Sequence, residues 1–309
     1  MKKSWVRQII YPLLAAAIWG MAFVFQSVST EHLGPFTFTA LRSGVGAAFL
    51  GIVLLGRKLL TRCGVLTPQP PRNRKALLWG GFLCGTVLTV ATNLQQYGLS
   101  ETSPGKGAFI TALYVVLVPV AGLLLFRRRQ SPALWISIVL AVGGLYFLCI
   151  NGETGISVSD LYILLCAVAF TGHILVVDHF GTGVDGIELS CVQFVVVTLW
   201  SVIGMLLTEQ PTMAAIVPCI GAVLYVGILS SGVAYTLQIL AQKGSNPAVV
   251  SLLLCLESVF ATVATVLMLG QWMSGREMLG SALMLIAVVL AQIPSEAWKR
   301  IFRHRAPNQ

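Results

Sequence analysis

The sequence predicts an all-α polytopic membrane protein, with ten transmembrane helices arranged as two inverted five-helix repeats. Of its 309 residues, 56% are apolar and only 10% are charged, whereas a water-facing surface needs roughly a quarter to a third of its residues charged. Apolar runs long enough to span a bilayer recur along the whole chain, and the second half repeats the order of features of the first. A soluble globular protein is therefore excluded.

The predicted spans are apolar runs bounded by Gly, Pro and charged residues. A spanning helix uses about 20 residues, so ten spans take roughly 200 residues and leave about 100 for short connections and tails. No room remains for a separate soluble domain. In chain order, the runs cover residues 9–28, 35–55, 76–98, 105–126, 132–150, 159–177, 187–207, 214–241, 247–269 and 277–294.

Basic residues between these runs predict the orientation. Seventeen of the 20 Lys and Arg residues fall on one side of the predicted membrane, and cytoplasmic loops carry such an excess. Both termini are therefore expected to be cytoplasmic, in a cell (inner) membrane, as an even number of spans requires. The basic residues on that side lie within residues 2–7, 57–75 and 127–129, at Lys243 and within residues 299–305.

The loops on the opposite side carry little positive charge. They hold Glu31, His32, Glu101, Glu153 and Glu209. The loop 178–186 departs from the pattern, because it lies on the basic side yet carries Asp178 and Asp185 without Lys or Arg. Acidic residues contribute little to orientation, so the predicted sidedness stands.

An internal repeat relates residues 95–131 to residues 238–274 at a constant shift of 143, without a gap. Each half then holds five spans, and an odd number places the start of the second half on the opposite side of the membrane. The repeats must be inverted, as in many secondary transporters. At this shift Gln95 matches Gln238, Pro104 matches Pro247, Leu113 matches Leu256, Ala121 matches Ala264 and Ser131 matches Ser274.

Five stretches of the chain also carry a family resemblance. They are Trp19–Gly20, PFTFTALRSGVGA around Arg42, TSPGKGAFITALYVVLVP from Thr102, SSGVAYTLQILAQK from Ser230 and LLLCLESVFATVATVLMLGQ from Leu252. In this order and spacing they resemble EamA-like transporters of the drug/metabolite transporter superfamily. The resemblance implies one five-helix unit in residues 1–150, a second in residues 151–296 and a basic cytoplasmic tail in residues 297–309.

One departure from the family concerns two helices that the repeat relates. The family often has Pro just after the positions of Tyr114 and Glu257, whereas this chain has Val115 and Ser258 there. Pro119 comes later in the first of these helices. Kinks at these two positions are therefore not expected from the sequence itself.

Glu257 is the strongest candidate for function, because a charge at the bilayer centre costs about 2.5–3.5 kcal/mol on insertion scales. It lies about 15 Å along the helix that begins at Pro247, near mid-depth. Its carboxyl could carry a proton or anchor a cationic substrate group; alternatively, it is a protonated or paired structural group. Tyr114 matches Glu257 at the repeat shift and is expected to line the same cavity or to pack with a single hydrogen bond.

Three further candidates can carry positive charge. Arg42 could reach the membrane surface, pair with a carboxylate such as Glu257 or bind an anionic substrate group, and structural pairing is favoured. Lys106, between Gly105 and Gly107, is expected to be a solvated cation of a turn. His173 could titrate near neutral pH, although an isolated intramembrane His is more often a hydrogen-bonded interior residue.

Neutral polar and aromatic side chains complete the predicted cavity. Amides and phenols can bind polar solutes without a charge, but they also hold helices together. Trp19 lies far from the interfaces where Trp is enriched, so it is expected to form part of an apolar cavity wall. The predicted cavity residues are Trp19, Asn93, Gln96, Tyr97, Tyr114, His173, Tyr235, Gln238 and Glu257, with Glu257 and Arg42 as a coupling or ion pair.

The most consistent function is a secondary active transporter, with export favoured, of small organic metabolites such as amino acids or drug-like solutes. The resemblance suggests export of amino-acid-like or amphipathic metabolites. The expected partners are a small-molecule substrate and the lipid bilayer, with possible proton coupling and no nucleic acid. The chain has no phosphate loop, HExxH or metal-ligand spacing, so no cofactor, metal or catalytic residue is predicted. An intramembrane enzyme acting on a lipid-linked substrate is the alternative, and a passive channel is a third.

Overall fold

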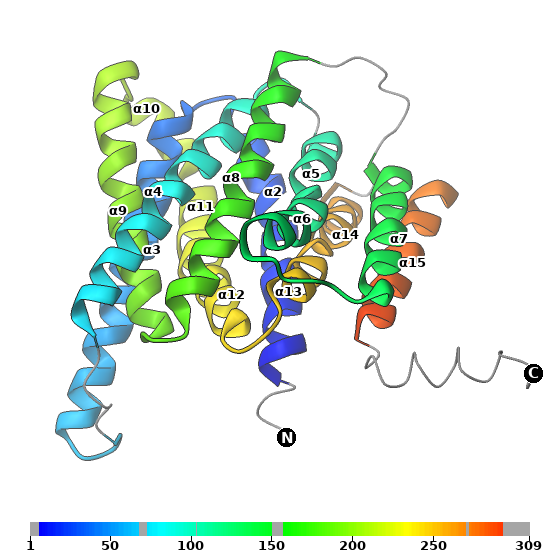
Figure 1. The fold of residues 1–309 in the computed structure, drawn as a ribbon. Coiled ribbons are helices and arrows are strands. Elements are labelled where there is room, and N and C mark those ends of the chain that lie inside the picture. Colours follow the sequence, from blue (N-terminus) through cyan, green and yellow to red (C-terminus); the bar gives the residue numbers. More distant parts are fainter. Residues whose placement is uncertain (1–5, 68–72, 103, 150–156, 270–271, 293–309) are drawn as a thin grey trace, which may run out of the picture.

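The computed structural model describes residues 6–67, 73–102, 104–149, 157–269 and 272–292, and all regular structure in these ranges is helical (Figure 1). Eight helical segments are long and apolar enough to cross a membrane, and a shorter apolar helix covers Pro132–Leu148. The predicted all-helical, membrane-spanning architecture is confirmed for this part of the chain. Outside the described residues lie Lys2, Lys3, Arg72, Glu153 and the tail 297–309.

The first half begins with a short π-helical turn, η1 (Val6–Ile10), and continues through α-helices. Pro opens several of them, because a residue of the first helical turn needs no N–H donor. Asn73 caps another by accepting a hydrogen bond from the N–H of Ala76 at 3.1 Å. These helices are α2 (Tyr11–Ser29), α3 (Pro35–Arg62), α4 (Arg74–Gly98), α5 (Pro104–Ala112), α6 (Tyr114–Phe126) and α7 (Pro132–Cys149).

The second half follows the same order with more interruptions. Ser157 and Ser274 form capping boxes with Asp160 and Glu277 at two helix starts. The elements are α8 (Val158–Gly181), α9 (Gly186–Thr208), α10 (Met213–Ile216), the 3₁₀ turn η2 (Val217–Cys219), α11 (Ile220–Tyr225), the π-helix η3 (Val226–Ala234), α12 (Tyr235–Gln242), α13 (Pro247–Leu254), α14 (Glu257–Leu269) and α15 (Gly275–Ala291).

Two predicted spans differ in detail from the structure. The helix predicted to end at residue 55 continues to Arg62, because the apolar run reports only the lipid-covered part and Arg, Lys and Leu remain good helix formers beyond it. The predicted span 214–241 is not one regular α-helix: Pro218 lies in the 3₁₀ turn η2 and is followed by the π-helix η3. Such irregular turns inside helices often occur at functional sites.

Two helices are interrupted at positions that the shift of 143 relates. The fourth span breaks at Leu113, between α5 and α6, and the ninth breaks at Cys255 and Leu256, between α13 and α14. Both breaks occur although neither Tyr114 nor Glu257 is followed by the Pro that the family often has there. Each break places a candidate residue, Tyr114 or Glu257, at the first position of the following helix.

The packing of the helices follows the same correspondence between the halves. The second helix of one half, α3, packs on its counterpart α9, and the fifth, α7, packs on α15. The first helix α2 packs on α14, while α8 packs on α5 and α6. If each helix is replaced by its counterpart in the other half, the same contacts result. The largest buried apolar cluster contains residues from both halves.

Glycines permit close contact of α2 with α14 and of α3 with η3. A Cβ on Gly20 of α2 would lie 2.7 Å from the backbone oxygen of Glu257, and one on Gly46 of α3 would lie 2.9 Å from the backbone oxygen of Gly227 in η3. Small residues permit such close approach of helices in membranes. These contacts hold α14 against α2 and η3 against α3, and thereby position Glu257 and Arg42.

Candidate functional site: a buried cavity between the two halves

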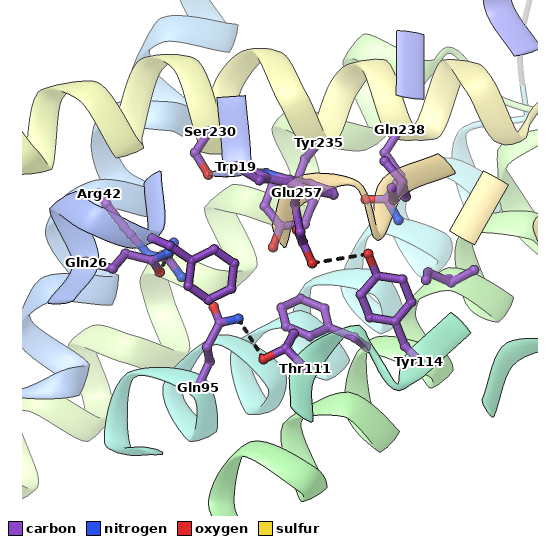
Figure 2. A pocket seen from close by; sticks show the side chains of 14 residues that line it. Trp19, Gln26, Arg42, Gln95, Thr111, Tyr114, Ser230, Tyr235, Gln238 and Glu257 are labelled. Carbon is purple, nitrogen blue, oxygen red and sulfur yellow. Dashed lines mark hydrogen bonds between the residues drawn. The ribbon is translucent and has the colours of Figure 1, made fainter. Parts of the chain in front are cut away.

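A small cavity lies at the centre of the bundle, between the two halves of the chain (Figure 2). Its volume is about 40 Å³, which is room for about three water molecules. Helices α2, α3, α4 and α5–α6 of the first half and α8, η3, α12 and α13–α14 of the second contribute to its wall. The cavity must widen before it can hold an organic molecule.

Glu257 and Tyr114 meet across the halves at one side of the cavity. The phenol of Tyr114 donates a hydrogen bond to Oε1 of Glu257 at 3.2 Å, and both residues are 4% exposed. The break before α14 makes Glu257 its first residue, where the helix dipole favours a carboxylate. The two residues that the repeat relates are therefore hydrogen-bonded to each other.

Arg42 lies on the other side of the cavity and is 3% exposed. Its Nη1 donates to Oε1 of Gln26 at 3.3 Å, and its guanidinium lies 5.8 Å from the centre of the Phe38 ring, a cation–π distance. In the described ranges no carboxylate forms an ion pair with it. Arg42 and Glu257 thus line the same cavity, but they do not form an ion pair in this structure.

Aromatic and amide groups line the rest of the wall. The rings of Trp19 and Tyr235 lie 4.8 Å apart, and Gln238 reaches the cavity from α12 (Figure 2). The indole Nε1 of Trp19 and Oε1 of Gln238 are buried without hydrogen-bond partners. Buried polar atoms normally have partners, so water or a ligand in the cavity would satisfy these atoms.

Six of the residues named from the sequence line this cavity, and the others lie beside it or away from it. The amide nitrogen of Asn93 donates to the Thr89 carbonyl at 2.9 Å and to Oγ of Ser201 at 3.3 Å. Tyr97 is 36% exposed and lies near Phe36 and Tyr162. The residues that line the cavity are Trp19, Arg42, Tyr114, Tyr235, Gln238 and Glu257.

Gln96 and His173 support the cavity from behind its wall. Gln96 donates to the backbone carbonyl of Gln26 at 3.2 Å, which fixes α4 against α2. His173 is fully buried, its Nε2 lies 3.1 Å from Oε1 of Gln193, and its ring lies 5.9 Å from that of Tyr235. Both residues therefore pack against residues that line the cavity.

The structure adds lining residues that the sequence prediction did not name. Gln26 and Thr111 carry a weak signal, since each is a polar residue within an apolar run. Gln95 carries a further signal, because the repeat matches it to the cavity residue Gln238. The apolar residues had no distinguishing pattern. The added residues are Phe23, Gln26, Gln95, Thr111, Phe170, Ile174, Ser230 and Leu254.

A larger hollow of about 540 Å³, here called the vestibule, opens at the end of the bundle where α2 and α4 end and α8 begins. Phe23, which lines the cavity, packs with Ala108 and with Leu99, which lines the vestibule. This apolar cluster, here called the plug, has one residue in the wall of each space.

Lys106 lies in the vestibule wall rather than in a solvated turn, so that expectation is wrong. Its Nζ forms an ion pair of 2.7 Å with Oδ2 of Asp160, and its side chain is only 14% exposed. Asp160 belongs to the capping box of α8 and also accepts a hydrogen bond from Thr102 at 3.1 Å. The capping box therefore presents a carboxylate from the second half to a Lys of the first half.

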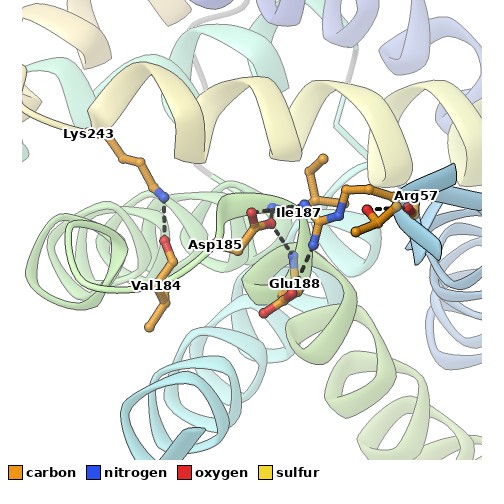
Figure 3. Close-up of polar contacts among 7 residues, drawn as sticks. Arg57, Val184, Asp185, Ile187, Glu188 and Lys243 are labelled. Carbon is orange, nitrogen blue, oxygen red and sulfur yellow. Dashed lines mark hydrogen bonds and ion pairs between the residues drawn. The ribbon is translucent and has the colours of Figure 1, made fainter. Parts of the chain in front are cut away.

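Ion pairs join the halves at the opposite end of the bundle, here called the basic end (Figure 3). Arg57 at the end of α3 binds Oδ2 of Asp185 at 2.9 Å and Oε1 of Glu188 at 2.8 Å. Asp185 also caps α9 by accepting hydrogen bonds from the N–H groups of Ile187 and Glu188. Lys243 donates to the backbone carbonyl of Val184.

The acidic loop 178–186 is explained by these contacts. Besides the pairs of Asp185, Asp178 forms an ion pair with Arg128, which follows α6 in the first half. The carboxylates of this loop therefore neutralise basic residues contributed by the other half, at the same end of the bundle.

The fold and the cavity define a polytopic helical membrane protein with two corresponding halves around a buried, partly polar centre. The chain belongs to the EamA-like transporter family, whose family model matches residues 6–150 and again residues 157–292. This family is part of the drug/metabolite transporter superfamily. The predicted family is thereby confirmed.

Two curated relatives carry the same general description. An uncharacterized transporter of Archaeoglobus fulgidus is 25% identical over 282 residues, which are 91% of this chain and 84% of the relative. The uncharacterized transporter YwfM of Bacillus subtilis is 25% identical over 296 residues, with 91% of this chain and 92% of the relative covered. The family and these names indicate a membrane transporter rather than an enzyme.

The fold is also found among solved structures. One crystal structure matches with a TM-score of 0.73 over 97% of this chain and 99% of the other, at 19% sequence identity. At this identity the similarity concerns the fold alone.

Proposed function

We propose that the protein is a secondary active transporter that exports small organic metabolites, such as amino acids or drug-like amphipathic solutes, by alternating access. The observation that carries the proposal is the buried cavity between the halves, which contains both a buried Arg42 and a buried Glu257. Ionisable residues inside a membrane protein typically mark a substrate or ion pathway.

The proposed architecture is ten spans in two inverted repeats, with the basic end in the cytoplasm and the vestibule facing outward. The interchangeable contacts of the two halves support this architecture. So do the opposite directions of α2 and α8 in Figure 1, since these are the first helices of the two matched segments. Inverted repeats of this kind let one half rock against the other around a central site.

The two closures of the cavity support alternating access. The plug lies between it and the vestibule, and the ion pairs of Arg57 and Arg128 join the halves at the basic end. A solute enters the widened cavity when the contacts at the basic end separate, and it leaves through the vestibule when the plug moves aside.

We assign proton coupling to Glu257. An ionised carboxylate is costly when it is buried without a cation, and the partner that the structure gives Glu257 is the neutral phenol of Tyr114. The charged groups and phenols nearest to it in the cavity are Arg42, Tyr114 and Tyr235. Protonation of Glu257 in one conformation and release in the other would couple solute movement to a pH gradient.

Transport by the purified protein in liposomes tests the proposal. Uptake of a panel of labelled amino acids, organic acids and amphipathic amines is measured with and without an imposed pH gradient. At least one class should accumulate above protein-free vesicles, and more so with the gradient. Absence of protein-dependent uptake for every class would contradict the proposed function.

Two Trp variants provide a matched control for this assay. Trp19 lines the cavity, whereas Trp79 on α4 is 59% exposed on the outside of the bundle. Trp19→Ala should change the rate or selectivity of uptake at least several-fold, and Trp79→Ala should leave both unchanged. Equal effects of the two substitutions would argue against this cavity as the path.

A further inference from the structure

Arg42 is a cation in the centre of the bundle without a charged partner. It is 3% exposed, its Nε is buried without a hydrogen-bond partner, and the contact of its Nη1 with Gln26 is long, at 3.3 Å. Among the residues that the structure describes, no Asp or Glu lies within ion-pair distance of its guanidinium. An Arg side chain stays charged even when it is buried, so a counter-charge is missing.

The nearby carboxyl of Glu257 does not supply that charge. Its Oε1 accepts the hydrogen bond of Tyr114, and the carboxyl lies across the cavity from Arg42 and Gln26 (Figure 2). The free space of about 40 Å³ belongs to the same cavity. The guanidinium therefore lines a space that can hold a ligand once the cavity widens, and it has no structural counter-ion there.

The chemistry of the wall restricts the ligand. Guanidinium matches a carboxylate with two parallel hydrogen bonds, and the amides of Gln26 and Gln95 provide further polar contacts in the cavity. The aromatic rings of Trp19 and Tyr235 form a further part of the wall. A single guanidinium balances a monoanion, and the rings accommodate an apolar remainder.

We infer that Arg42 is the anion subsite of the transporter, and that its solutes are small organic acids or zwitterions whose carboxylate binds the guanidinium. This inference rests on the proposed transport function and narrows its substrate class. The bound carboxylate takes the Nε and Nη donors and displaces the long contact with Gln26. The selectivity-determining contact is then a buried ion pair that forms when the solute binds.

The test compares carboxylates with their own primary amides, which differ in charge but little in shape. The probes are leucine, phenylalanine, isovalerate and phenylacetate, each beside its amide. Binding to the detergent-purified full-length protein is measured as the shift of its thermal unfolding, and transport as uptake into proteoliposomes. The variants are Arg42→Gln, Arg42→Lys and, as a control, Arg276→Gln on α15, whose guanidinium lies 5.2 Å from the Tyr146 ring away from the cavity.

At least one carboxylate should stabilise the wild type more than its amide does and should be transported at least ten-fold better. Arg42→Gln should abolish this preference, Arg42→Lys should retain part of it, and Arg276→Gln should retain it fully. The unfolding temperature of unliganded Arg42→Gln should equal or exceed that of the wild type, because the variant loses a buried charge without an ion-pair partner. A marked fall would instead indicate a structural role.

Two results would overturn the inference. One is that no carboxylate stabilises the wild type more than its amide; the other is that Arg42→Gln keeps the ten-fold preference. Uptake of neutral or cationic probes without any preference for carboxylates would refute the anion subsite and leave the transport function standing. Binding of carboxylates without uptake of any probe would support the subsite and contradict the transport function.

Discussion

The two ends of the cavity are closed by different kinds of contact. At the basic end, Arg57 of the first half binds Asp185 and Glu188 of the second, so charge joins the halves directly. At the vestibule end, the plug of Phe23, Leu99 and Ala108 comes from the first half alone. The cross-half pair of Lys106 and Asp160 lies in the vestibule wall and leaves about 540 Å³ open.

This difference indicates which end opens more easily from the described conformation. Opening the basic end requires separation of the halves and breakage of several ion pairs. Opening the vestibule end requires displacement of a thin layer of apolar side chains. In the proposed export cycle, release through the vestibule is therefore the smaller movement and entry from the basic end the larger one.

Thiol labelling should report the orientation of the two ends as an all-or-none result. In a background without the native cysteines, Glu31→Cys and Ser100→Cys near the vestibule should react with an impermeant thiol reagent added to intact cells. Lys58→Cys and Arg129→Cys at the basic end should react only after permeabilisation. All four native side chains are exposed, so access depends on sidedness. The reverse labelling pattern would show that the vestibule faces the cytoplasm and the basic end faces outward.

Glu257→Gln should give the next largest effect, because Gln resembles the protonated acid and cannot release a proton. We expect pH-driven accumulation to be lost while exchange of solute across the membrane is retained. Uptake and counterflow in the same proteoliposomes separate the two activities. Tyr114→Phe, which removes the hydrogen bond to Glu257, should retain coupling. Undiminished pH-driven uptake by well-folded Glu257→Gln would refute proton coupling through this residue.

Arg57→Gln should weaken the closure of the basic end. The Arg57 side chain is 22% exposed, and partly exposed ion pairs contribute about 0.2–1 kcal/mol each. Loss of both pairs should then shift the conformational equilibrium roughly ten-fold. The shift is measured as faster labelling of Gln238→Cys from the cytoplasmic side in inverted vesicles.

A charge exchange isolates the ion pair from other effects of the Arg57 substitution. Arg57→Glu combined with Glu188→Arg should restore slow labelling in part, and it leaves the cap residue Asp185 in place. Lys58→Gln, an exposed neighbour on α3, is the control and should have no effect. If it accelerated labelling as much as Arg57→Gln does, general surface charge would explain the result.

Phe23→Ala should have the smallest effect, a few-fold faster labelling of Gln26→Cys from the outer side. The substitution removes the largest side chain of the plug, whereas the ion pairs at the basic end are unchanged. Phe82→Ala on α4 removes a 38% exposed ring elsewhere and serves as the control. Unchanged labelling in Phe23→Ala would show that the plug is not the barrier.

The sequence predicted the spans and the depth of residues along them well. It predicted less well which of these residues point into the cavity. Apolar runs and the repeat located the helices, and the repeat placed Tyr114 and Glu257 in one site. Trp19, Tyr235 and Gln238 also line the cavity, but His173 lies behind Tyr235 and Asn93 packs against α9. Depth follows from residue counting at 1.5 Å per residue, which says nothing of the direction around the helix axis.

Which side of a helix lines the cavity is difficult to predict here for a physical reason. In a water-soluble helix the buried face is apolar and the exposed face polar, whereas lipid is as apolar as a protein core. Phe23 and Leu254 in the cavity wall therefore look like the lipid-exposed Leu124 or Leu206 in sequence. The partners of Lys106 and of the loop 178–186 could not be predicted either, since both depend on contacts between the halves.

The hydrogen bond between Tyr114 and Glu257 joins two positions, related by the shift of 143, in the two segments that the family model matches. In a dimer of identical chains with this packing, the two positions would carry the same residue, so two carboxyls or two phenols would meet. Two adjacent carboxylates cannot both ionise readily. In a single chain the two positions can differ, so that a donor faces an acceptor. Different residues at the two matched positions thereby leave one ionisable carboxyl in the cavity instead of two.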